Sequence, residues 1–429
     1  MVFDYAGPML RMGHEQRACF FATLAYSWLV LALTAPGIPI VWDEGEYLAR
    51  AQNIIEWFRY MPGSMSEEGI FRHWLFIRYG EGHPAGSALP IAMSRWLGSP
   101  MLDPLIAARL GPITLFSIAC AAIAVRLKTT YGPIAAIAAP VALLTFPRIF
   151  SEAHFATQDG QLTAWWLLLW VVQSSTSIGT ASTISLGIVL GLTTATKFTG
   201  WCAWGPTVVG QVIQRNGGAL RRLAIAVPVA LLVFYVVNPP LWYSPLDGMR
   251  EHFGRNLGRA NTINITTWFM GNVHSMTRPL PWYNTLVWLV FVTPVPTLAF
   301  GIVGLTSCLR SPTPFSITLV LHWITLMVVR AMPQAPPHDG IRLFLPAFGF
   351  WCVFAGIGTQ RVLDFITRFS SARWRLALRV AIVAALVGNA INVARYYPQT
   401  LSHYNLIAGG LRGAATKGDG TGVLVGWPG

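Results

Sequence analysis

The stretch that decides how this chain folds is VWDEGEYLAR, residues 41–50, which directly follows the first strongly apolar segment. Asp43, Glu44 and Glu46 place three carboxylates within four consecutive residues there. Pro36 and Pro39 interrupt the apolar segment, so the pattern predicts a new helix over residues 43–58. Carboxylates so close to the end of an apolar segment need a physical explanation.

Helix capping is one explanation of these acids. Asp43 as N-cap, with Glu46 three residues later, has the spacing of a capping box, and acids favour a helix N-terminus. Capping does not explain Glu44. The alternative is a catalytic role, because Asp43, Glu46, Tyr47 and Arg50 share the helix face opposite the apolar positions. The pattern leaves both explanations open.

Composition excludes an ordinary soluble protein. Only 11% of the 429 residues are charged, 54% are hydrophobic, and the mean hydropathy is +0.51. Repeated apolar runs of roughly 17 to 25 residues are long enough to cross a bilayer as helices. The predicted fold class is an all-α polytopic membrane protein. The five cysteines lie in or beside apolar segments, with neither a disulfide framework nor a CxxC metal pattern.

The apolar pattern predicts about 11–13 transmembrane helices with outer juxtamembrane helices. The piece at 85–97 is short and contains Arg95, so we expect a surface or re-entrant helix there. Eleven spans can be drawn, at 18–35, 105–126, 132–146, 160–174, 181–195, 199–214, 221–237, 284–309, 314–331, 342–360 and 376–395.

The charge distribution predicts the orientation. With the N-terminus in the cytoplasm, the inner loops hold twelve basic residues and only three acidic ones. This excess of inner positive charge is the usual one, and it accounts for the net charge of +13 without a nucleic-acid partner. We therefore expect residues 1–429 to form one transmembrane domain whose outer parts are 37–104, 147–159, 238–283 and 396–429.

Two outer segments precede apolar helices. EGHP, residues 81–84, comes before the short helix; Pro84 is ordinary at a helix start, and His83 is either a surface residue or a group facing helix 43–58. The second, residues 147–159, contains Glu152 and His154 and ends at Asp159, where the next span enters the membrane. A carboxylate there is costly unless it is paired, caps the helix or functions, so capping and a role opposite Asp43 both remain.

Two cations lie at outer turns. Lys197 is in the tight turn TATKFTG, residues 194–200, where snorkelling of its ammonium to the lipid surface would explain it. Arg342, just after His338, lies at a helix start, where the dipole disfavours a cation. An anionic partner would offset this unfavourable interaction between Arg342 and the helix dipole.

The order of these motifs resembles that of the polyprenyl-phosphate-sugar-dependent glycosyltransferases of the GT-C superfamily. That superfamily includes protein O-mannosyltransferases and aminoarabinose transferases of lipid A. The similar parts are an Asp-Glu after the first span, a His-Pro before a short helix, an Asp after the third span, a Thr-Lys-x-x-Gly turn and an Arg-x-x-x-Pro. PWY at 281–283 and the segment 397–414 are similar to bacterial family 39-like members, and the resemblance covers residues 20–425.

The resemblance implies a membrane glycosyltransferase that moves a sugar from a polyprenyl-phosphate donor to a protein, lipid or polysaccharide acceptor. Transfer would invert the sugar, on the extracytoplasmic side of a bacterial inner membrane. Asp43 would be the catalytic base, Glu44 its neighbour and Asp159 the second acid, while Lys197 and Arg342 would hold the donor phosphate. Six further residues are candidates for lining the site: His83, Glu46, Tyr47, Glu152, His154 and His338.

Elementary chemistry agrees with this division of roles. A sugar that leaves from phosphate needs no general acid, because fixed cations stabilise the leaving oxygens and one base activates the acceptor. The sequence establishes no cofactor, and a divalent metal between phosphate and carboxylates stays open. A transporter or flippase is the alternative; it predicts ionisable residues at mid-span and paired halves, and no inverted repeat is visible. A purely structural subunit is the third hypothesis.

Overall fold

A computed structural model describes residues 12–74, 83–175, 179–213, 217–258, 265–338, 340–369 and 371–416. Within these ranges the chain is mostly helical, and its one sheet is a two-stranded antiparallel hairpin. The all-α polytopic fold class is therefore confirmed. Glu81 and Gly82 of the predicted EGHP motif lie outside the described residues.

Every predicted span coincides with a helix or with two consecutive helices. The described residues contain six helices long and apolar enough to cross a membrane, or seven if the bent pair α6–α7 counts as one span. The bundle helices are α1 (His14–Thr34), α5 (Pro104–Thr130), α6 (Pro133–Leu144), α8 (Gln158–Gln173), α9 (Thr180–Thr196), α10 (Trp204–Ile213), α11 (Gly217–Val236), α14 (Asn284–Val292), α15 (Val295–Arg310), α16 (Pro314–Ala331), α17 (Leu345–Ile366) and α18 (Ala372–Tyr396).

The structure divides the predicted span 284–309 into two α-helices. α14 ends at Val292 and α15 begins at Val295, with Thr293 and Pro294 between them in extended or non-helical conformation. Proline has no backbone N–H and its ring clashes with the preceding turn, so a helix cannot continue unchanged through Pro294. The predicted span 284–309 therefore consists of two shorter helices.

α17 forms the centre of the bundle, and its side chains from Leu345 to Thr359 are buried. It packs against α15 through glycines. A Cβ on Gly304 would lie 1.9 Å from the Phe354 carbonyl oxygen, and one on Gly358 would lie 1.9 Å from that of Phe300. Small residues that let two backbones approach in this way are typical of helix contacts in membranes.

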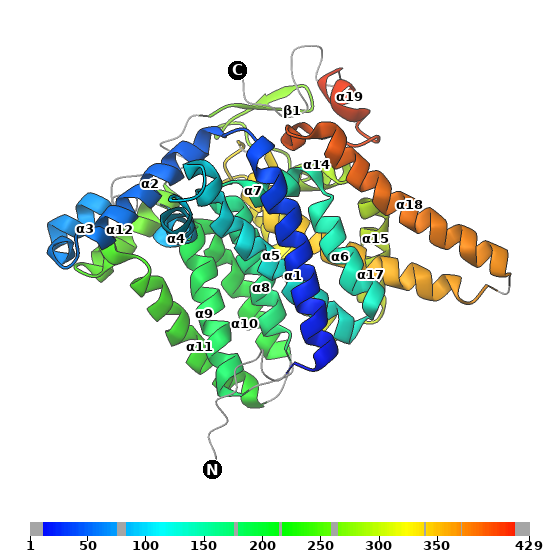
Figure 1. Ribbon diagram of the computed structural model, residues 1–429, viewed down its shortest axis with the longest axis horizontal. Coiled ribbons are helices and arrows are strands. Elements are labelled where there is room, and N and C mark those ends of the chain that lie inside the picture. The colour runs from blue at the N-terminus through cyan, green and yellow to red at the C-terminus, as the bar shows by residue number, and fades with distance from the viewer. Residues whose placement is uncertain are drawn as a thin grey trace.

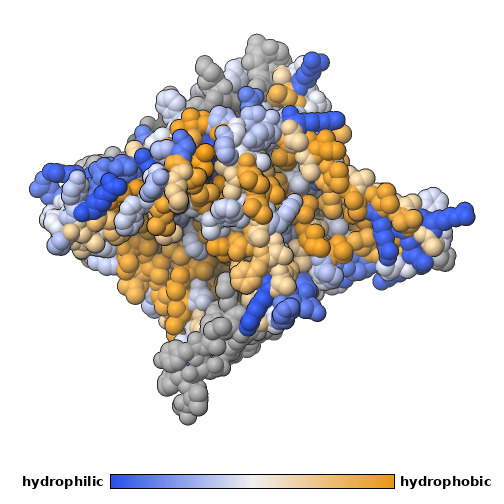
Figure 2. Space-filling model, in the orientation of Figure 1, coloured by the Kyte–Doolittle hydropathy of each residue, from blue (hydrophilic) through white to orange (hydrophobic). Residues whose placement is uncertain are grey.

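The outer surface of the bundle is apolar. Figure 2 shows hydrophobic side chains along its flanks, whereas hydrophilic ones gather at projecting tips such as α3 (Glu67–His73). α18 projects from the bundle (Figure 1) and exposes Leu376, Val380 and Val383. Apolar surface of this extent is what a lipid-facing helix bundle requires.

One end of the bundle is covered by shorter elements (Figure 1). The piece at 85–97, predicted as a surface or re-entrant helix, is a 3-10 turn, η3 (Ala85–Ser87), followed by α4 (Ala88–Gly98), whose 11 residues are too few to span a bilayer. The other covering elements are α2 (Trp42–Arg59), α7 (Pro147–His154), α12 (Pro245–Leu257), β1 (Thr267–Phe269), β2 (Asn272–His274) and α19 (Gly410–Thr416).

Three of the predicted inner cations, Arg126, Lys128 and Arg222, lie at the opposite end. Arg126 Nε donates to Ser174 Oγ (2.9 Å), just after α8 ends. Lys128 Nζ pairs with Glu15 (3.1 Å), near the start of α1, and Arg222 donates to the Val172 carbonyl (2.9 Å). These contacts bring the end of α5, the start of α1, the end of α8 and α11 together at one end of the bundle.

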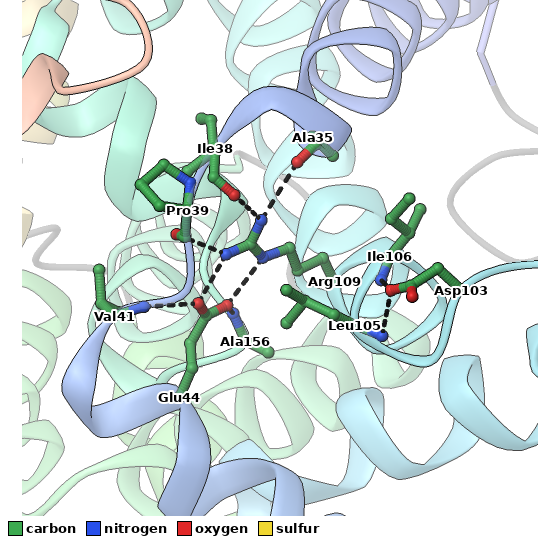
Figure 3. A network of polar contacts seen from close by, with 10 residues as sticks. All are labelled: Ala35, Ile38, Pro39, Val41, Glu44, Asp103, Leu105, Ile106, Arg109 and Ala156. Carbon is green, nitrogen blue, oxygen red and sulfur yellow. Dashed lines mark hydrogen bonds and ion pairs between the residues drawn. The ribbon is translucent and has the colours of Figure 1, made fainter.

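One buried ion pair fixes the start of α2 (Figure 3). Arg109 of α5 donates to both oxygens of Glu44, at 2.8 and 2.6 Å, and to the carbonyls of Ala35, Ile38 and Pro39. One pair therefore joins α5 to α2 and to the segment that leaves α1.

Glu44 also accepts main-chain hydrogen bonds, from the N–H groups of Val41 (3.1 Å) and Ala156 (2.8 Å). α2 begins at Trp42 after Val41, so the predicted capping box of Asp43 and Glu46 is wrong. Glu44 is the acid that satisfies the first backbone N–H. The sequence could not reveal this, because the choice depends on Arg109, 65 residues away.

We expect the Glu44–Arg109 pair to be necessary for stability. Glu44→Gln should destabilise the chain by about 3–5 kcal/mol, because it leaves a buried guanidinium without its counter-ion. Arg109→Met should be worse, since three carbonyls also lose their donor. Melting temperatures in detergent measure both effects. Glu68→Gln breaks an exposed pair with Arg72 and is the control, expected to cost under about 1 kcal/mol. Equal melting of all variants would contradict this role.

Candidate functional site

A cavity of about 460 Å³ opens at the end of the bundle covered by the short elements. α2 forms one wall with Trp42, Asp43, Glu46 and Tyr47. The remaining lining comes from His83, the start of α8, the turn after α9, the ends of α12 and α16, and the segment before α17. Segments far apart in the chain therefore share one hollow.

Asp159 is the centre of the charged cluster beside this cavity. Its side chain is fully buried, and Lys197 Nζ lies 2.5 Å from Oδ1. Arg342 donates to Oδ2 through Nε (3.2 Å) and Nη2 (3.0 Å), and Nη2 also donates to Asp43. The structure thus brings together the two aspartates and the two cations that the sequence singled out.

Local structure decides how each of these charges is held. Thr157, not Asp159, occupies the N-cap of α8, and both Asp159 oxygens bind cations, so the capping explanation does not hold. Lys197 follows α9 in extended conformation with its side chain buried, which excludes snorkelling. Arg342 lies in η6 (Gly340–Phe344), just before α17, and its two anionic partners offset the unfavourable helix dipole.

Glu152 adds a third acid to the cluster. α7 turns 75° away from α6 and lies in the predicted outer segment 147–159, with every residue except Arg148 buried. Glu152 Oε1 lies 3.8 Å from Arg342 Nε, and Oε2 has no hydrogen-bond partner among the described residues. Burial raises the pKa of Glu152 to about 8, and Arg342 offsets only part of this effect. Burial therefore favours the protonated form of this carboxyl.

The other predicted site residues divide into two groups. Glu46, Tyr47, His83 and His338 line the cavity. Glu44 and His154 do not line it. Glu44 is held by Arg109, while His154 contacts the Thr34 hydroxyl (2.8 Å) and the Phe150 carbonyl (2.5 Å). Both therefore support the elements around the cavity instead of facing it.

The sequence analysis missed several lining residues, among them Gln158, Thr199 and Arg330. Arg330 Nη2 donates to the carbonyls of Pro337 (2.8 Å) and His338 (3.3 Å), so it holds the turn between α16 and α17. Its position at the end of an apolar span could have drawn attention to it. Gln158 and Thr199 are neutral neighbours of charged residues, and no pattern distinguishes them.

The arrangement does not by itself form a metal site. Among the residues that the structure describes, no group of three or more His, Cys, Asp or Glu side chains could hold a metal ion. Asp43 and Asp159 bind Arg342 and Lys197. The expectation of a divalent metal stays untested.

No protein-family model matches the sequence, and no curated protein matches it. The fold is similar to that of solved membrane proteins. ArnT from Cupriavidus metallidurans, bound to undecaprenyl phosphate, has a TM-score of 0.59 at 17% identity over 91% of this chain and 74% of its own.

A second similar structure is the archaeal oligosaccharyltransferase AglB from Archaeoglobus fulgidus, in complex with an inhibitory peptide and a dolichol-phosphate. Its TM-score is 0.58 at 12% identity, over 89% of this chain and 56% of AglB. Both are glycosyltransferases of the GT-C superfamily. The chain therefore has a GT-C-like membrane fold, as the order of its motifs predicts.

Proposed function

We propose that this chain is a membrane glycosyltransferase that moves a sugar from a polyprenyl-phosphate donor to an acceptor hydroxyl or amine. The observation that carries the proposal is the convergence of Asp43, Asp159, Lys197 and Arg342 beside one cavity of a GT-C-like fold. The similar structures of ArnT and AglB contain undecaprenyl phosphate and dolichol-phosphate, which supports a donor of this class.

Lys197 and Arg342 would bind the donor phosphate. When the sugar leaves, the phosphate diester becomes a monoester and gains negative charge, which fixed cations stabilise. Asp159 holds both cations in place beside the cavity. Arg342 is partly exposed, so a phosphate can reach it.

Asp43 would be the general base. Its carboxylate is partly exposed on the cavity wall and bound to Arg342. A phosphate that attracts Arg342 would leave this carboxylate available to the acceptor. The acceptor then forms its bond to the anomeric carbon, the bond from that carbon to phosphate oxygen breaks, and Asp43 takes the acceptor's proton. Attack on the face opposite the phosphate inverts the sugar.

The charge distribution supports an extracytoplasmic site. Arg126, Lys128 and Arg222 lie at the end of the bundle away from the cavity, and an excess of such cations in short loops marks the cytoplasmic side. The transporter alternative requires ionisable groups along a path across the middle of the membrane. Arg109, a buried charge in a span, is instead bound to Glu44 and to backbone carbonyls.

We expect Asp43→Asn to reduce sugar transfer by about 100-fold or more, because a positioned general base contributes that much. Transfer would be assayed in membranes from undecaprenyl-phosphate-linked glucose, mannose and aminoarabinose. Binding of undecaprenyl phosphate alone should be retained. Asp247→Asn is the matched control, an exposed aspartate on α12. Undiminished transfer by Asp43→Asn would refute the role of Asp43.

Asp159→Asn should act differently from Asp43→Asn. It removes the charge that holds Lys197 and Arg342, so we expect weaker binding of undecaprenyl phosphate as well as slower transfer. Titration of the purified variant with that lipid measures the effect. An unchanged affinity would show that Asp159 does not position the cations.

Glu152→Gln should show a pH-dependent gain in stability. An unfolded glutamate ionises near 4.5, whereas folded Glu152 keeps its proton until about 8, so the free energy of unfolding falls as pH rises between these values. The variant cannot ionise. Its melting temperature should therefore rise relative to the wild type between about pH 5 and pH 8 and stay level above. Exposed Glu68→Gln is the control, and a gap independent of pH would mean that Glu152 is already ionised.

A further inference from the structure

Gln158 is a buried amide in the cavity wall. Its side chain is only 4% exposed, it lines the cavity, and its Oε1 has no hydrogen-bond partner among the described residues. An amide oxygen buried without a donor costs about 1–3 kcal/mol. A ligand that donates a hydrogen bond in the cavity would remove this cost.

The position of Gln158 distinguishes it from other buried amides. Gln161, Gln211, Asn284 and Asn389 also have an amide oxygen without a partner, but none of them lines the cavity. Nearby Asn238 shows the usual arrangement, because its Oδ1 accepts from the Ala85 N–H at 2.8 Å. Among the described amides of this kind, Gln158 is the one that lines the cavity.

Gln158 directly precedes Asp159, which holds the two cations proposed for the phosphate. In a polyprenyl-phosphate sugar, a single oxygen joins the phosphate to the sugar ring. A phosphate beside Lys197 and Arg342 therefore brings the ring hydroxyls close to the first turn of α8. Lys197 and Gln158 both line the cavity, so one ligand can contact both.

We propose that Gln158 Oε1 accepts a hydrogen bond from a hydroxyl or amino group of the donor sugar. This inference rests on the proposed function and names a residue that recognises the sugar, separately from those that bind the phosphate. The site then distinguishes the loaded lipid from the spent one. Cations alone would bind the product polyprenyl phosphate at least as well as the donor, because the product carries more charge.

The test compares two lipids on the purified full chain in nanodiscs. Binding is measured for undecaprenyl phosphate and for undecaprenyl-phosphate-linked glucose, mannose and aminoarabinose, and the tightest sugar lipid is used. Gln158→Met removes the oxygen at nearly constant volume. It should weaken binding of the sugar lipid about tenfold, equal to about 1.4 kcal/mol, with less than about a twofold change for undecaprenyl phosphate. Gln52→Met carries the same substitution outside the cavity lining and should change neither affinity.

An equal affinity of wild type and Gln158→Met for the sugar lipid would overturn the inference. The inference would also be overturned if, for each of the three sugar lipids, the wild type bound no more tightly than Gln158→Met. Loss of both affinities in Gln158→Met and also in Gln158→Ala would show that Gln158 supports the fold of the site instead of the sugar. Failure of the proposed function looks different, because the wild type itself would bind neither class of lipid.

Discussion

Asp159 is fully buried, and its carboxylate is stable there because Lys197 and Arg342 both bind it. A buried carboxylate without a counter-ion would cost several kcal/mol, so the three side chains must stay together. Since they come from α8, the end of α9 and the turn before α17, this requirement fixes the relative positions of three parts of the bundle. The same contacts place two cations beside the cavity.

Glu44 and Arg109 form a second buried ion pair, in which each charge compensates the other. Neither residue lines the cavity, yet the pair holds α2 in the position from which Asp43 contacts Arg342. The adjacent acids Asp43 and Glu44 thus have different environments, one partly exposed and one fully buried. The Asp-Glu pair therefore combines a residue that lines the cavity with one that positions its helix.

Much of this fold could be predicted from the sequence. Apolar runs predict the spans because lipid requires long apolar helices, and the alternation of short loops predicts which charges share an end. For that reason, the sequence could predict that Asp43, Asp159, Lys197 and Arg342 lie at the same end of the bundle. The sequence could not predict which side chains pair between helices. Whether Asp43 or Glu44 meets Arg109, and whether Lys197 is exposed or buried, depends on packing that sequence spacing does not encode.

Two further polar residues of the site, Glu152 and Gln158, differ from the charged ones in how they can contact a ligand. Burial raises the pKa of Glu152 to about 8, which favours its protonated form, and Gln158 has no charge. Each has an oxygen without a partner among the described residues, close in sequence to Asp159. If Glu152 were ionised, another negative charge would stand beside Arg342 and compete with a phosphate for it. A neutral Glu152 leaves the guanidinium to the anions that share it, while Gln158 offers an acceptor to a neutral, hydroxyl-rich group. Cations beside uncharged acceptors suit a ligand with one anionic and one polyhydroxylated part.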